Sequence, residues 1–509
     1  MIVLHEYPLS IVEHEGFRRY SNSLQPLFKV PSRNTIRADI FKMFEAEKHK
    51  LQRVLESNSS RVAITTDMWT ASNQKRGYMA ITAHFIDESW VLQDRIIRFM
   101  YVPSPHDAEN LGDALMECLL DWNIERKLLT LTLDNCSTND AMVNVMLDKL
   151  DKSLLLVNGK LLHMRCAAHI LNLIVKEGLE NLFGSGVERI RESIAFWTAT
   201  PKRSEKFEES VRHLNIPCSK VLSLDIKTRW NSTYLMLSTA LIYKDVFSRL
   251  RQREPQYRKL GPKLPSEEDW ELAKEMCERL KPFFKITETV AAAMVDKFEK
   301  YWLDIHGILA LAVVLDPRYK MDLVDFQFTR IYGKEEAQSY SKKVLDMCYD
   351  LVSQYQAIQS KEDDLDSFSN FSCVDEDVDP LSDYDMYISI KKRSRSGPSK
   401  KTEMDLYLDE EVLPRNGNFD ILCWWKTNSL KYPTLGKIAR DILAIPVTTV
   451  ASESAFSTGG RCVSPSRNRL HPRTVEALII SSVGEASRSL HYIYALFYVC
   501  VCVLFYVFI

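Results

Sequence analysis

The amino-acid sequence predicts an α/β fold with a large share of helix, divided into more than one domain. The chain has 509 residues, 46% hydrophobic and 26% charged, so it can form two or three domains with their own cores. Three strand-like runs follow one another between residues 61 and 103. Helical periodicities over residues 184–215 and 266–356 indicate a large helical part.

The first elements are a helix and a meander of three strands. Residues 33–57 place apolar side chains at helical spacing, which predicts an amphipathic helix. The next three runs are rich in β-branched and aromatic residues, and short polar turns separate them. We therefore expect strands at 62–65, 78–86 and 90–102.

The elements that follow complete the order of a ribonuclease H-like domain. A helix is expected at 106–121, a strand at 127–134 and a helix at 139–154. In this order of elements the first and fourth strands lie side by side. Beyond them we expect a short strand at 161–165, a helix at 167–183, a break at Leu315–Tyr319, and helices at 419–428, 434–443, 448–458 and 472–482.

Three acids lie in unusual surroundings. Asp67 and Asp134 end apolar, β-branched runs that predict buried strands, where a carboxylate is costly unless it is paired or binds a ligand. Glu453 lies in an expected helix. Two strand-end carboxylates and one helical acid are suitable ligands for a divalent metal that assists phosphodiester cleavage. The alternative is that each aspartate caps the loop or helix that follows it.

These acids belong to a longer series of segments in one order. The series includes Arg165 to Leu173, Thr228 to Thr233 and the block from Asp405 to Ile480. From residue 4 to about 482 the chain resembles the hAT (hobo/Activator/Tam3) transposase superfamily. The residue patterns and the resemblance together divide the chain into a helical N-terminal segment (1–60), a ribonuclease H-like core (61–183), a helical insertion (184–360), an acidic then basic linker (361–404) and a C-terminal dimerisation region (405–485). An apolar tail (486–509) follows and is not expected to belong to the fold.

The resemblance also implies roles for individual residues. In this family the acids hold two divalent ions, so Asp67, Asp134 and Glu453 inherit catalytic and metal-binding roles, with Mg²⁺ or Mn²⁺ as the cofactor of an active enzyme. His169 is expected to approach the scissile phosphate, unless it is a core histidine. Cys166 and His169 supply two ligands where a structural zinc site needs four, so we expect no zinc.

Two further groups of residues have open alternatives. The resemblance implies that Trp230, beside Arg229, stacks on a base extruded next to the cut, whereas a buried anchor is the alternative. The C-terminal block carries an apolar stripe that is either an internal core or an interface, and the resemblance favours a homodimer or association with related hAT-type proteins. The stripe includes Trp424, Trp425, Leu435, Ile438 and Ile442.

The charge distribution allows a DNA-binding protein. The net charge is −2, but residues 362–385 hold ten acids and no Lys or Arg, which leaves +8 for the rest of the chain. The basic cluster from Lys391 to Lys401 is typical of a nuclear-import signal, or of a solvated linker.

The two ends depart from the family pattern. We find no Cys-x-x-Cys pair of the kind that opens the BED zinc finger of full-length relatives, so sequence-specific DNA binding is in doubt. From His491 to Ile509 the chain is uniformly apolar and long enough for a tail anchor. Its aromatic and β-branched content instead favours translated non-coding sequence, so a membrane partner is not expected.

The sequence therefore predicts a transposase-derived, DNA-binding, dimerising nuclear protein, and favours a domesticated regulator of gene expression over an enzyme. An active transposase that cleaves and transfers DNA strands is the alternative. A tail-anchored membrane protein is a third class, supported by the last nineteen residues alone.

Overall fold

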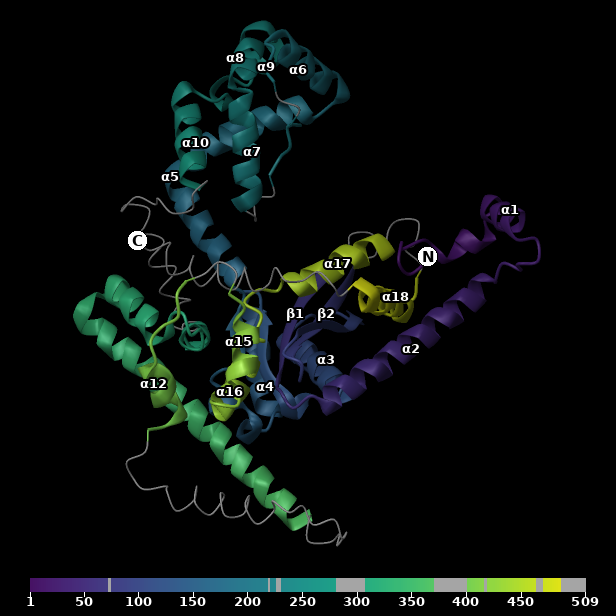
Figure 1. Cartoon of the computed structure of the whole chain (residues 1–509). Coiled ribbons are helices and arrows are strands. Elements are labelled where there is room, and N and C mark those ends of the chain that lie inside the picture. Colours follow the sequence, from purple (N-terminus) through teal and green to yellow (C-terminus); the bar gives the residue numbers. More distant parts are fainter. Residues whose placement is uncertain are drawn as a thin grey trace. The chain divides into compact units, whose positions relative to one another are not determined.

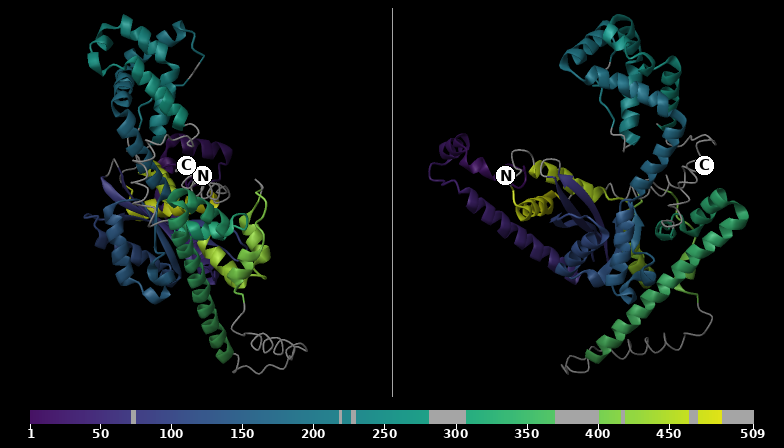
Figure 2. Two further views of the ribbon diagram at one scale, coloured as in Figure 1. Left: turned by 90° about the vertical axis from the view of Figure 1, so that its left-hand side faces the viewer. Right: turned by 180° about the vertical axis from the view of Figure 1, so that it is seen from behind.

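The computed structural model of the chain describes residues 1–71, 75–217, 220–225, 230–280, 307–369, 401–415, 419–463 and 470–486. The chain divides into two compact units. One, here called the core unit, contains the described residues within 1–166 and 307–486. The other, here called the helical unit, contains the described residues within 167–280. Figures 1 and 2 show the elements of both units.

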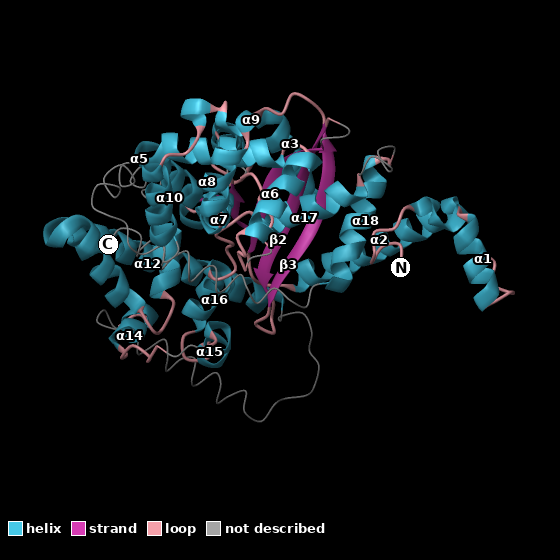
Figure 3. Cartoon of the chain, turned by 90° about the horizontal axis from the view of Figure 1, so that it is seen from above, coloured by secondary structure: helices cyan, strands magenta, loops and turns pink. Residues whose placement is uncertain are grey.

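The core unit contains a five-stranded mixed sheet with the strand order β3-β2-β1-β4-β5. Figure 3 shows the strands of this sheet in magenta. β1 pairs antiparallel with β2 and parallel with β4, and β5 is parallel to β4. This topology confirms the prediction that the first and fourth strands are neighbours in a ribonuclease H-like fold. The strands are β1 (Val62–Ala71), β2 (Arg76–Ile86), β3 (Leu92–Val102), β4 (Leu128–Leu133) and β5 (His163–Arg165).

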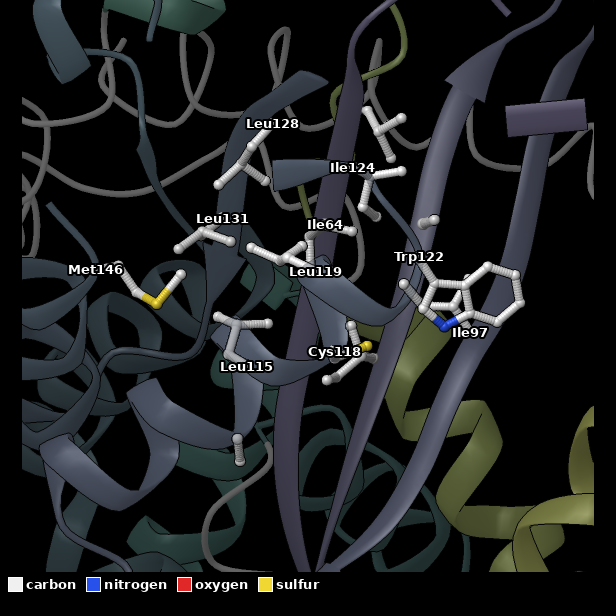
Figure 4. Close-up of a cluster of buried hydrophobic side chains, with 14 of the residues drawn as sticks. Ile64, Ile97, Leu115, Cys118, Leu119, Trp122, Ile124, Leu128, Leu131 and Met146 are labelled. Carbon is white, nitrogen blue, oxygen red and sulfur yellow. The ribbon is translucent and has the colours of Figure 1, made fainter. Parts of the chain in front are cut away.

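Helices α3 (Ala108–Asp121) and α4 (Ser137–Lys149) cover one face of the sheet. Leu115 and Leu119 of α3 pack with Ile64 of β1 and Leu131 of β4 in a fully apolar cluster (Figure 4). Asp107 caps the N-terminus of α3, where its side chain accepts a hydrogen bond from the Asn110 N–H. This layer fixes the strands whose carboxyl ends carry the predicted acids.

The opposite face is covered by helices from both ends of the chain. α18 (Pro472–Ala486) contacts both β3 and α2 (Arg33–Ser57), and α17 (Val450–Cys462) crosses β1 and β2 (Figure 1). Because both faces are covered, β2 is buried without interruption from Gly77 to Ile86. A continuously apolar run, in place of alternation, is the sequence pattern of such a strand.

The other elements of the core unit pack around this sandwich. α12 contacts α14 and α16 and contains a bend at Gly333, whose φ of 77° would strain any other residue. Residues 307–314 are also helical. The remaining elements are η1 (Leu9–Glu13), α1 (Glu15–Leu24), η2 (Glu125–Lys127), η3 (Lys152–Leu154), η4 (Leu156–Gly159), α12 (Lys320–Ser369), α14 (Glu403–Asp409), α15 (Ile421–Asn428) and α16 (Pro433–Ile442).

The helical unit has its own aromatic core. Trp197, Phe207, Tyr257 and Trp270 are buried there. Its elements are α5 (Ala167–Thr198), α6 (Pro201–His213), α7 (Trp230–Ile242), α8 (Lys244–Arg253), α9 (Pro255–Arg258), η5 (Gly261–Lys263) and α10 (Glu267–Leu280).

The structure divides the chain differently from the predicted domains at two points. The predicted boundary at residue 183 lies inside α5, since this helix continues to Thr198. α12 lies in the core unit, whereas the predicted insertion included it up to residue 360. The reason is specific contacts: the Tyr355 hydroxyl donates to the buried carboxylate of Asp441, and the Tyr349 hydroxyl donates to Asp405 at 2.5 Å.

Two predicted features lie outside the described residues. These are the basic cluster as far as residue 400 and the apolar run from His491 to Ile509. In the described parts of the chain, no helix has the length and apolar character that a membrane span requires.

Candidate functional site

The parallel pairing of β1 and β4 brings the backbones of two predicted acids together. Asp134 directly follows β4, whereas Asp67 lies within β1, because this strand continues to Ala71 and not only to the predicted end at residue 65. The strands are parallel, and Thr65 pairs with Thr132. Asp67 lies two residues beyond Thr65, and Asp134 lies two beyond Thr132. Both aspartates are half-buried. The register therefore places their backbones beside each other, as the order of elements predicted.

The alternation of side chains along β1 shows which face Asp67 occupies. Ile64 belongs to the apolar cluster under α3 and α4. Thr65 and Trp69 contact α17 on the opposite face. Because side chains alternate along a strand, Asp67 lies on the α17 face, between these two residues.

α17 carries the third acid to this face. The Ser452 hydroxyl donates to the Thr65 hydroxyl at 3.1 Å. Phe456, one helical turn later, stacks on Trp69 with a centroid distance of 6.0 Å. Glu453 follows Ser452 directly and is half-buried. The two contacts on either side of Glu453 hold its helix turn against the segment of β1 that contains Asp67.

A series of buried hydrogen bonds continues from this contact across the sheet. Thr65 Oγ1 lies 2.9 Å from His84 Nε2 on β2, and His84 Nδ1 is hydrogen-bonded to Asp94 on β3. Since Ser452 donates to Thr65, every group in this series has a partner when the Thr65 hydroxyl donates to His84 Nε2 and His84 Nδ1–H donates to Asp94. The sequence analysis did not predict this series of hydrogen bonds. The available signal was a histidine inside an otherwise apolar strand.

Backbone and amide groups also contact the two aspartates. Asp67 Oδ1 accepts the Met68 N–H at 2.7 Å, and Asp134 Oδ1 accepts the Asn139 side-chain amide. Within the described ranges, no three or more His, Cys, Asp or Glu side chains lie close enough together to hold a metal ion. The three carboxylates suit a hard divalent cation by their chemistry, but their oxygens do not converge on one point.

The other predicted catalytic and DNA-contacting residues lie in the helical unit or beyond the described residues. His169 is half-buried in the first turn of α5, in a different unit from the three acids. Trp230 is the first residue of α7. Arg229 lies outside the described residues. Cys166, the last residue of the core-unit segment, is buried and accepts a hydrogen bond from Thr449 at 3.5 Å.

The residues predicted to form a dimer interface lie mostly inside the core unit. Trp425 is fully buried and donates from Nε1 to the Leu315 carbonyl at 2.9 Å. Leu435, Ile438 and Ile442 are also buried, and Trp424 packs edge-on against Trp425. A partner chain could not reach the four buried side chains without opening the fold. The apolar side chain most exposed in this block is Leu430, at 92%.

A second polar contact joins the C-terminal block to the sheet, and the sequence analysis did not predict it. The Arg440 guanidinium donates to both Glu88 oxygens at 3.0 and 3.1 Å and to the Ile86 carbonyl. Burial opposes ionisation of Glu88, but hydrogen bonds from Arg440 and Ser59 outweigh it and lower the Glu88 pKa to about 2. Arg440 therefore anchors α16 at the turn between β2 and β3.

Four family models match the chain in succession. The ZBED1 RNase-like domain matches residues 65–161, and the ZBED1 RNase-like helical domain matches residues 164–279. The hAT-like transposase, RNase-H fold, matches residues 268–355. The hAT family C-terminal dimerisation region matches residues 403–482, which contain Glu453 and the buried stripe. Ribonuclease H-like transposase folds are generally dependent on divalent metals.

Full-length relatives cover almost the whole chain. Zinc finger BED domain-containing protein RICESLEEPER 2 of Oryza sativa is 38% identical over 94% of this chain and 72% of its own length. DAYSLEEPER of Arabidopsis thaliana is 36% identical over 94% and 71%. A Zea mays protein named "Putative AC transposase" is 38% identical over 94% and 63%. The chain therefore belongs to the hAT family of transposases and transposase-derived proteins.

Proposed function

We propose that this transposase-derived protein binds DNA as a dimer in the nucleus and regulates gene expression. The observation that carries the proposal is the docking of α17 on β1. This helix belongs to the segment matched by the dimerisation region, and it packs on the sheet of the ribonuclease H-like core. The part of the chain that would join two subunits and the part that would handle DNA are thus one structural unit.

The charge distribution supports DNA as the partner. Outside the acidic stretch at residues 362–385 the chain carries +8, and such an excess attracts nucleic acid through counterion release. Several relatives are named as zinc finger BED domain-containing proteins. The basic cluster from Lys391 to Lys401 would direct nuclear import.

Binding of a labelled DNA duplex to the full chain tests this function. Fluorescence anisotropy at a series of salt concentrations should show affinity that falls steeply as salt rises, as expected when Lys and Arg side chains replace phosphate counterions. Absence of binding at low salt would contradict the proposal. Binding that does not depend on salt would also contradict it, because the attraction would then not be electrostatic.

The second candidate is an active transposase. It is favoured by the convergence of β1, β4 and α17, the elements that carry Asp67, Asp134 and Glu453. We propose these three carboxylates as the ligands of Mg²⁺ or Mn²⁺, with His169 near the scissile phosphate and Arg229 and Trp230 as DNA contacts. When bound, the metal would supply Lewis-acid stabilisation of the phosphodiester oxygens.

Strand nicking separates the two candidates. Nicking of supercoiled DNA by the wild-type chain with manganese, lost in Asp67→Asn and in Glu453→Gln, would establish the enzyme. DNA binding without nicking would establish the regulator.

A further inference from the structure

A cavity of about 610 Å³ lies at the β3 edge of the sheet, and none of the three acids lines it. Its walls come from α2, β3 and α18, three elements of the core unit that pack on one another. α18 contacts both α2 and the edge strand β3. The cavity is therefore built by α2, by β3 and by α18, the last described helix.

Basic side chains dominate this cavity. Arg37, Lys48, Arg98 and Arg473 line it, against two acids, Glu45 and Glu476. Arg98 is neutralised by its own partners, because Asp121 lies at 2.8 Å and Glu476 at 3.8 Å. In the described part of the chain, the other three cations make no ion pair within 4 Å of a carboxylate, although Lys48 and Arg473 attract Glu476 over a longer distance. Four cations and two acids line the cavity, so its lining carries an excess of positive charge.

Aromatic rings accompany these cations. Phe41 and Phe44 line the cavity from the same side of α2 and are only partly buried. The Arg37 guanidinium lies 5.7 Å from the centre of the Phe41 ring. Cations that track a phosphate backbone, interleaved with rings on which bases stack, are the elements of a single-strand binding surface.

We propose that this cavity binds a short stretch of a DNA strand. Phosphates lie against Arg37, Lys48 and Arg473, and an unpaired base stacks on Phe41 or Phe44. The inference rests on the proposed DNA binding and specifies where on the core unit a strand is held.

Charge reversal on α2 and α18 tests the proposal. Arg37→Glu on α2 and Arg473→Glu on α18 are compared with Arg53→Glu, since Arg53 is exposed on α2 and does not line the cavity. Binding of a fluorescein-labelled single-stranded oligonucleotide to the full chain is measured by anisotropy. Each cavity variant should weaken binding about tenfold and make its salt dependence shallower, while Arg53→Glu leaves both unchanged within about twofold.

A neutral variant tests the stacking step. Phe44→Leu keeps an apolar side chain of similar bulk, so it should weaken single-strand binding and leave binding of a blunt duplex unchanged. Melting temperatures of all variants identify any that fail to fold. If Arg37→Glu and Arg473→Glu bind like Arg53→Glu, the cavity proposal is overturned while the proposed function stands. If the wild-type chain binds neither single-stranded nor duplex DNA, both are overturned.

Discussion

The Ser452 hydroxyl donates a hydrogen bond to the Thr65 hydroxyl across 3.1 Å, although 387 residues of chain separate them. This contact joins the dimerisation region to the central strand of the ribonuclease H-like core. It is the first link of the buried chain that continues through His84 to Asp94. The position of Glu453 relative to Asp67 therefore depends on polar groups in the middle of the sheet.

Removal of the Thr65 hydroxyl should loosen this contact. In Thr65→Val, the buried Ser452 hydroxyl and His84 Nε2 lose their shared partner, so we expect a loss of about 1–3 kcal/mol in the free energy of unfolding. Thr70→Val is the control, because Thr70 is an exposed residue of the same strand and should change stability by less than about 0.5 kcal/mol. Urea denaturation measures both, and equal stabilities of the two variants would contradict the role of the contact.

A pair of adjacent glycines tests how closely α17 packs on the sheet. A Cβ on Gly459 would lie 2.7 Å from the tip of the buried Phe99 ring, whereas a Cβ on Gly460 would lie 3.8 Å from Trp69. Gly459→Ala should therefore destabilise the fold by about 1–3 kcal/mol through overpacking. Gly460→Ala should be neutral or should stabilise it by up to about 1 kcal/mol, since alanine favours helix. The reverse order of melting temperatures would mean that α17 does not lie against Phe99.

The helical unit carries a contact whose strength depends on pH. The Arg189 guanidinium donates to both oxygens of the buried Asp269 carboxylate, and this lowers the Asp269 pKa from 3.8 to about 2. A lowered pKa in the folded state gives stability that is fully present above pH 3.8 and is lost as the pH falls towards 2.

Asp269→Asn should consequently be about 1–3 kcal/mol less stable than wild type at pH 7, and this difference should shrink between pH 4 and pH 2. Thermal unfolding of both proteins across this pH range measures the difference in stability. Hydrogen exchange of the α5 and α10 amides shows whether the loss lies in the helical unit. A difference that is constant with pH would show that the pair is not the cause.

An exposed leucine of the C-terminal block provides a test of dimerisation. Leu430 is 92% exposed and lies in the matched dimerisation region, so Leu430→Glu should weaken a homodimer without lowering the melting temperature of the monomer. Leu27→Glu is the control, since Leu27 is 88% exposed outside that region. Sedimentation of the full-length variants over a range of concentrations gives their masses. Equal masses for both variants would exclude Leu430 from the interface.

The sequence predicted the order of elements better than the contacts between them. β-branched runs and turns located the strands, because strand patterns are local. The neighbourhood of Asp67 and Asp134 followed from the ribonuclease H-like order of elements, in which the first and fourth strands are adjacent. For the apolar stripe that includes Trp425 and Leu435, the sequence allowed an internal core or an interface, and the resemblance favoured the interface. Both side chains are buried within the chain itself. A pattern of apolar residues predicts that their side chains are buried, but it does not show whether the same chain or a second subunit buries them. The contacts Ser452–Thr65 and Arg440–Glu88 join distant segments, and no local pattern predicts them.

For the transposase candidate, we propose that Asp67, Asp134 and Glu453, whose oxygens do not converge on one point in this structure, close around a divalent cation when it binds. Because neighbouring carboxylates repel one another, a cation that binds all three should stabilise the folded state by about 1.4 kcal/mol at a tenfold excess over its dissociation constant.

The most direct measurement is the melting temperature of the full chain with and without manganese, for wild type, Asp134→Asn and Asp148→Asn. Asp148 is an exposed acid of α4 and controls for non-specific binding. We expect manganese to raise the melting temperature of wild type and Asp148→Asn by a few degrees and to leave that of Asp134→Asn unchanged. The same rise in all three proteins, or no rise in wild type, would contradict the claim.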